Sequence, residues 1–146
     1  MTPEAERKIA AWIPAIAYIG LIFGVSSIAG LSPPVPTFKL FDKAAHVVEF
    51  TGLALFLTVA FRGSLPAARR GAAALFVVAL GLAIGVLDEV YQLSVPGRSL
   101  EFLDWVADAV GVLIGATAGA LHGRLAAGGR VRAPGPGVTD NERRGT

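Results

Sequence analysis

The segment Ala72–Tyr91 reads AAALFVVALGLAIGVLDEVY and carries no charged side chain before Asp88. A helix needs roughly 20 apolar residues, rising about 1.5 Å each, to cross the hydrocarbon core of a bilayer. This segment has that length and composition, and its acids, Asp88 and Glu89, come only near its end. The sequence therefore predicts a transmembrane helix that finishes in a pair of carboxylates.

Three further segments are also apolar when averaged over about 19 residues. They are Ile9–Leu31, Ala44–Phe61 and Phe102–Leu121. The 146 residues are 53% hydrophobic and 16% charged, with a mean hydropathy of +0.61. A soluble domain usually has about 25% charged residues. We therefore expect an all-α polytopic membrane protein, a bundle of four transmembrane helices. The absence of cysteine excludes disulfides and thiolate metal sites.

Basic residues divide unequally between the two sides of the predicted membrane. The N-terminus, the connection Arg62–Gly71 and the C-terminal segment hold ten Lys and Arg residues, whereas the connections Ser32–Lys43 and Gln92–Glu101 hold three. Because Lys- and Arg-rich loops stay inside, we expect both termini to be cytoplasmic. Topology thus explains these charges, and no nucleic acid partner is predicted. We expect residues 1–123 to form the transmembrane domain and residues 124–146 to be a disordered basic tail.

Polar side chains gather where the spans end on the opposite, outer side. The seven acids outside the two termini all fall there, and acids at membrane depth are costly enough to indicate a functional site by default. We predict a ligand-binding site at the outer membrane face. Its residues are Lys43, His46, Glu49, Asp88, Glu89, Gln92, Arg98, Asp104 and Asp108.

Helical spacing places several of these residues on shared faces. In the third span, one face holds Gly81, Gly85, Asp88 and Gln92. In the fourth span, one face holds Asp104, Asp108, Gly111, Gly115 and Gly119. Small residues let helices approach closely in lipid. We therefore expect glycine seams that lead to carboxylates at the outer helix ends.

Two interpretations of this group remain open. In the first, it is a structural network that ties helix ends to the loop containing Arg98, whose guanidinium can clamp a carboxylate. In the second, it binds a ligand or performs acid/base catalysis, with His46, Glu49 and Asp88 as candidate catalytic groups. One histidine among carboxylates suits a hard divalent cation better than structural zinc, but the pattern is unspecific. We predict no metal and no other cofactor.

Four stretches together resemble the VanZ-like family of small bacterial membrane proteins. They are DKAAHVVEF (Asp42–Phe50), DEVYQ (Asp88–Gln92), PGRS (Pro96–Ser99) and DWVADAVG (Asp104–Gly111). Their order and spacing resemble the family pattern K-x-x-H-x-x-E/Y, D-E-x-x-Q, P-G-R and D-x-x-x-N-x-x-G. Phe50 departs from an aromatic hydroxyl position of that pattern, and Asp108 stands where asparagine is common.

The resemblance implies a four-helix, multi-pass protein of the bacterial inner (plasma) membrane. The family is named after a member linked to glycopeptide (teicoplanin) resistance, which implies a cell-envelope context without a reaction. Our leading hypothesis is an envelope protein that binds a lipid-linked or peptidoglycan-related ligand at the outer face. One alternative is a membrane enzyme that acts on a lipid-linked envelope intermediate, and another is a proton-coupled or ion transporter. Besides the lipid bilayer, a second copy in a homodimer is a reasonable partner, because four spans enclose little volume.

Overall fold

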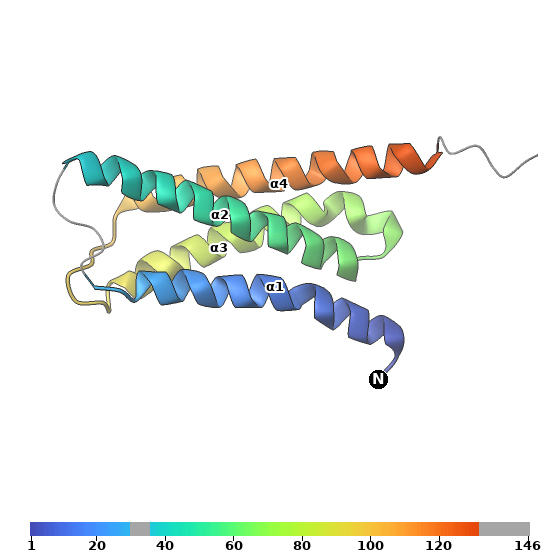
Figure 1. The fold of residues 1–146 in the computed structure, drawn as a ribbon, viewed down its shortest axis with the longest axis horizontal. Coiled ribbons are helices and arrows are strands. Elements are labelled where there is room, and N and C mark those ends of the chain that lie inside the picture. Colours follow the sequence, from blue (N-terminus) through green and yellow to red (C-terminus); the bar gives the residue numbers. More distant parts are fainter. Residues whose placement is uncertain (30–35, 132–146) are drawn as a thin grey trace, which may run out of the picture.

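The computed structural model describes the backbone of residues 1–29 and 36–131 and the side chains of residues 1–29 and 40–126. Helices α1 (Pro3–Ser26), α2 (Pro36–Ser64), α3 (Ala73–Gln92) and α4 (Phe102–Val131) form a bundle, with a short 3-10 helix, η1 (Ala67–Ala72), before α3 (Figure 1). Within these described ranges, four helices are long and apolar enough to cross a membrane and no strand occurs. The predicted all-α, four-helix fold is confirmed.

α3 agrees with its predicted span to within one residue at each end and α4 begins at Phe102 as predicted, but other helix boundaries differ from the sequence prediction. α1 begins at Pro3 because the Thr2 hydroxyl accepts a hydrogen bond from the Ala5 amide at 3.3 Å and proline suits the first helical turn. α2 begins at Pro36, whereas the sequence predicted a connection as far as Lys43. α4 continues to Val131, so residues 124–131, which the sequence assigned to the tail, are helical. The rest of the predicted tail, residues 132–146, lies outside the described residues.

The bundle has two ends with different contents. At one end, which we call the cluster end because the predicted site residues lie there, α1 and α3 finish and α2 and α4 begin (Figure 1). The opposite end, which we call the terminal end, contains the N-terminus, η1 and the last turns of α4. Large apolar side chains such as Leu55, Leu75 and Leu113 are exposed along the helices, as expected for a surface that lipid covers.

The core lies between α2 and α4, which make the most extensive contact in the bundle. A Cβ on Gly111 would meet the carbonyl oxygen of Val47, and one on Gly115 would lie 2.5 Å from that of Thr51. The Thr51 hydroxyl donates to the carbonyl oxygens of Val47, at 2.7 Å, and Gly111, at 3.1 Å. The predicted seam on α4 is therefore a backbone-to-backbone contact with α2, and it fixes the separation of the two helices.

Candidate functional site

The predicted site residues all lie at the cluster end of the bundle. Together with their neighbours they come from every long helix and from the connection between α3 and α4. We call the following residues the polar cluster: Ser26, Asp42, Lys43, His46, Glu49, Asp88, Glu89, Gln92, Arg98, Glu101, Asp104 and Asp108.

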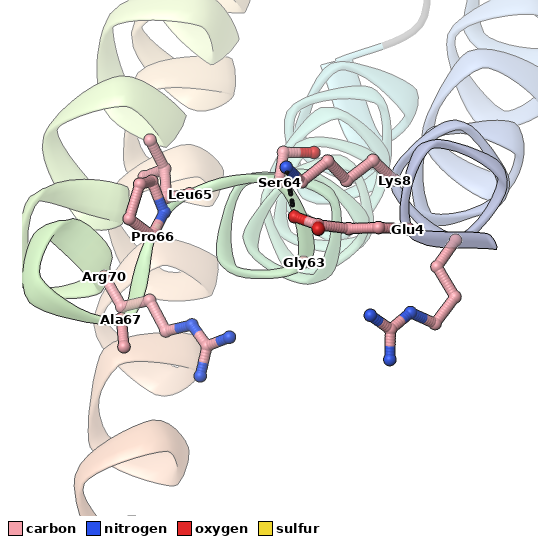
Figure 2. Close-up of a pocket in the computed structure, with 9 residues that line it drawn as sticks. Glu4, Lys8, Gly63, Ser64, Leu65, Pro66, Ala67 and Arg70 are labelled. Carbon is pink, nitrogen blue, oxygen red and sulfur yellow. Dashed lines mark ion pairs between the residues drawn. The ribbon is translucent and has the colours of Figure 1, made fainter. Parts of the chain in front are cut away.

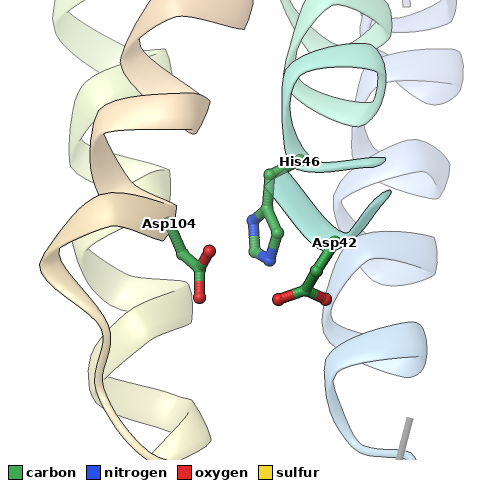
Figure 3. A group of neighbouring side chains, drawn as sticks. All are labelled: Asp42, His46 and Asp104. Atoms are coloured by element: carbon green, nitrogen blue, oxygen red, sulfur yellow. The ribbon is translucent and has the colours of Figure 1, made fainter. Parts of the chain in front are cut away.

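His46 lies at the centre of the polar cluster, on α2 and one helical turn after Asp42. Its Nδ1 atom is 2.8 Å from Oδ1 of Asp108 on α4. The imidazole ring also lies between the carboxylates of Asp42 and Asp104 (Figure 3). Because the hydrogen bond to Asp108 occupies Nδ1, the other ring nitrogen, Nε2, is the one available to a further group.

Lys43 joins α2 to the start of α4. Its Nζ atom is 2.8 Å from Oε2 of Glu101, forms an ion pair with Asp104, and is 3.9 Å from Oδ2 of Asp42. The ammonium is therefore shared among three carboxylates. Asp42 lies on α2 itself, whereas Glu101 and Asp104 lie at the start of α4. This part of the cluster is an ion-pair network that joins α2 to the start of α4.

Asp88 is held by side chains from two helices. Its Oδ2 atom accepts hydrogen bonds from the Ser26 hydroxyl on α1, at 2.8 Å, and from the Gln92 side chain, at 2.9 Å. The predicted face of α3 is confirmed, since α3 continues to Gln92 and its Gly81, Gly85, Asp88 and Gln92 are buried. Ser26 was not predicted, because a serine at the end of an apolar span carries no sequence signal of its own.

Glu89 connects the end of α3 to the start of α4. Its Oε2 atom accepts a hydrogen bond from the Glu101 backbone amide at 3.0 Å. Asp88 Oδ1, Glu89 Oε1 and Asp108 Oδ2 are buried and have no hydrogen-bond partner among the residues whose side chains are described. Buried carboxylate oxygens without a partner are costly, so each is a place where a proton, cation or ligand donor would be stabilised.

A cavity of about 250 Å³ opens beside these groups. Its polar wall contains Asp42, His46, Glu49, Gln92 and Arg98, and its apolar residues include Val25, Phe41 and Ala45. Glu49 and Arg98 are thus placed at the cavity. The predicted residues outside its lining are Lys43, Asp88, Glu89, Asp104 and Asp108. Asp42 and Ser26, which the predicted site left out, belong to that lining.

A second polar cavity, of about 520 Å³, lies at the terminal end. Figure 2 shows Glu4 and Lys8 of α1 facing the end of α2, with Arg70 of η1 on the other side. The Glu4 and Lys8 side chains form an ion pair of 2.7 Å within one helix turn. This cavity contains none of the predicted site residues.

The model of the VanZ/LLP1 family matches residues 4–122, which include all of the polar cluster. The chain belongs to the VanZ/LLP1 family. This confirms the resemblance that the sequence motifs indicated, and it makes the bundle a multi-pass membrane protein. Neither a curated protein nor a solved structure matches this VanZ/LLP1 chain.

Proposed function

We propose that this VanZ/LLP1 protein binds the headgroup of a lipid or of a lipid-linked precursor in the bacterial cell envelope. The cavity at the polar cluster carries this proposal. It joins charged residues to the apolar Val25 and Phe41, which are 37% and 70% exposed on the surface of the bundle. An amphiphile fits both parts, because its acyl chain can lie along the apolar rim while its headgroup enters the polar wall.

The charges of the cavity indicate the chemistry of that headgroup. The guanidinium of Arg98 suits a phosphate, which it can bind through two nitrogens. The carboxylates of Asp42 and Glu49 suit an amine or hydroxyl groups. A cavity of about 250 Å³ is close to the lower limit of small-molecule sites, which favours a headgroup over a whole glycopeptide.

The distribution of basic residues supports an outer location for this site. The basic residues at the terminal end, opposite to the polar cluster, include Arg7 and Lys8 at the start of α1, Arg62 at the end of α2, and Arg69 and Arg70 in η1. The positive-inside rule then favours a cytoplasmic terminal end and an outward-facing cluster in the inner membrane. A headgroup in the outer leaflet would be within reach of the cavity.

Lipid binding by the purified full-length protein tests the proposal. We expect phosphatidylethanolamine, which has a phosphate and an amine, to bind more tightly than phosphatidylglycerol, which lacks the amine. Glu49→Gln and Arg98→Lys should each weaken phosphatidylethanolamine binding by about tenfold, the effect of losing one charge-assisted hydrogen bond. Native mass spectrometry of the protein with each lipid measures this.

Two matched variants at the terminal end serve as controls. Glu6→Gln and Arg69→Lys make the same chemical changes at exposed positions, and both should bind lipid as the wild type does. Equal binding of the two lipids, or equal losses in the cluster and control variants, would contradict the proposal.

A cellular test addresses the link to the envelope and to glycopeptide resistance. Asp88→Asn, Arg98→Lys and Asp104→Asn should each abolish any change in teicoplanin susceptibility that expression of the wild type produces. Immunoblots of the membrane fraction must show unchanged protein levels. Loss of the protein itself would instead identify the cluster as a structural network.

An enzyme acting on a lipid-linked envelope intermediate is the second candidate. The hydrogen bond of 2.8 Å between His46 and Asp108 favours it, because a carboxylate that orients a histidine is a recurring arrangement for a general base. His46 also lines the cavity. Turnover of a lipid-linked substrate by the wild type, and its loss in His46→Ala, would support catalysis; absence of turnover with and without divalent metal would count against it.

A transporter is less favoured. The central stretches 50–61, 73–87 and 109–121 contain no Asp, Glu, Lys, Arg or His, so the ionisable groups of the cluster do not continue toward the terminal end.

A further inference from the structure

Three buried side chains of the polar cluster have the composition of a metal site. His46 of α2, Glu89 of α3 and Asp108 of α4 each offer one ligand atom, and these atoms lie within 4.8 Å of one another. The three residues are 7%, 3% and 1% exposed. We propose that His46, Glu89 and Asp108 bind one divalent transition-metal ion of the Mn²⁺ or Zn²⁺ class.

The hydrogen bonds of the two acids support this assignment. Oε2 of Glu89 accepts from the Glu101 amide at 3.0 Å. Oδ1 of Asp108 is 2.8 Å from Nδ1 of His46, and an ion held by these two residues would take the place of the proton that the two atoms share. The other oxygens, Glu89 Oε1 and Asp108 Oδ2, are buried without a hydrogen-bond partner in the described part of the chain. Acidic residues alone are common, whereas two buried, unsatisfied carboxylate oxygens beside an imidazole require a cation or a proton.

The charge and the ligand types narrow the choice of ion. Two carboxylates balance the charge of one divalent cation when His46 is neutral. An imidazole nitrogen favours a transition metal over Mg²⁺ or Ca²⁺, which prefer oxygen ligands throughout. Glu89 is in turn held by a backbone amide, the kind of outer contact that orients a metal-binding carboxylate. Three protein ligands leave coordination positions for water or for a ligand.

A neighbouring group, Asp42, His46 and Asp104, meets the same distance criterion (Figure 3). There a cation is already supplied by the protein, because the ammonium of Lys43 pairs with Asp104 and lies 3.9 Å from Asp42. A metal ion beside that ammonium would be repelled. The inner group of His46, Glu89 and Asp108 is therefore the better site.

Metal titration of the full-length protein tests this inference. The protein, with its affinity tag removed, is treated with a chelator in an uncharged detergent, dialysed, and titrated with Mn²⁺ followed by electron paramagnetic resonance. We expect a single bound ion per chain, which Zn²⁺ displaces. His46→Ala, Glu89→Gln and Asp108→Asn should each lower the affinity by at least about tenfold.

The control variant His122→Ala should bind as the wild type does, because it removes the second histidine of the chain, which is exposed at the terminal end. Asp42→Asn changes the neighbouring group and tests which of the two groups holds the ion. Wild-type protein that binds neither Mn²⁺ nor Zn²⁺ would overturn the inference without the need for any variant. Loss of binding in Asp42→Asn, with binding kept in Glu89→Gln, would overturn it as well.

This inference does not rest on the proposed lipid binding, because the ion is titrated without lipid. If the protein binds no metal ion, its selectivity between lipid headgroups can still be measured. If it shows no headgroup selectivity, metal binding can still be measured.

Discussion

The cluster end and the terminal end of the bundle both carry many charged side chains, but in different surroundings. At the cluster end, Asp88, Asp104 and Asp108 are buried, and their partners come from other helices. At the terminal end, Glu4 and Lys8 pair within one helix, with side chains that are 66% and 46% exposed. Charges that link helices constrain the bundle, whereas charges within one exposed turn do not.

The comparison also separates two uses of charge in a membrane protein. The positive-inside rule counts the basic residues at the terminal end, and it depends on their number rather than on their contacts. The buried acids of the cluster end require specific partners, because an unpaired charge is costly away from water.

The largest effect should come from removing Lys43. Lys43→Ala takes the ammonium away from Glu101 and from the buried Asp104. We expect the free energy of unfolding to fall by about 3 kcal/mol, the lower range for breaking a buried pair, because Lys43 is partly exposed. Lys8→Ala should cause no measurable change. Unfolding in detergent, followed by circular dichroism, measures both, and equal losses would contradict the distinction between the ends.

A smaller effect should follow from a methyl group in the seam between α2 and α4. The Cβ of Gly111→Ala would meet the backbone of Val47 and Thr51, which cannot move independently. The atoms nearest to that of Gly123→Ala would belong to the guanidinium of Arg62, which can swing away. We expect Gly111→Ala to cost about 2 kcal/mol by overpacking and Gly123→Ala to be neutral or slightly stabilising, since alanine favours a helix. Thermal unfolding in detergent measures both, and a stable Gly111→Ala protein would show that the seam is looser than the structure indicates.

The smallest effect should come from two threonines of α2. Thr51 donates to Gly111 across the helix interface, whereas Thr58 donates to Ala54 in its own helix. Replacing each with valine keeps the shape and removes the hydroxyl. Thr51→Val should lower the free energy of unfolding by about 0.6 kcal/mol, typical of an interhelical hydrogen bond in a membrane protein, and Thr58→Val by less. The same unfolding measurement applies, and the reverse order would be evidence against the interhelical bond.

The sequence was sufficient to predict the spans, because hydropathy alone identifies apolar segments of about 20 residues. It did not predict where α2 begins or where α4 ends. Charged residues such as Asp42 and Lys43 look like loop residues to a hydropathy window, yet they lie inside α2, where Lys43 finds its partners at the start of α4. Contacts between helices, which hydropathy cannot represent, stabilise the helix at these positions.

The sequence predicted which residues lie together in the polar cluster, but not every pair that they form. Helical spacing placed Asp88 with Gln92, and the structure joins them by a hydrogen bond of 2.9 Å. The pairing of His46 with Asp108 depends on the relative shift of α2 and α4, which the seam at Gly111 sets and no local pattern encodes. Whether these residues bind a ligand stays a prediction.

Gly111 follows Asp108 by less than one turn of α4, and Val47 follows His46 directly on α2. The contact of Gly111 with Val47 and the hydrogen bond between His46 and Asp108 are thus neighbouring contacts between the same two helices. A movement that parts α2 from α4 at this level must act on both contacts together, so the separation of the two helices and the geometry of the His46–Asp108 pair cannot change independently.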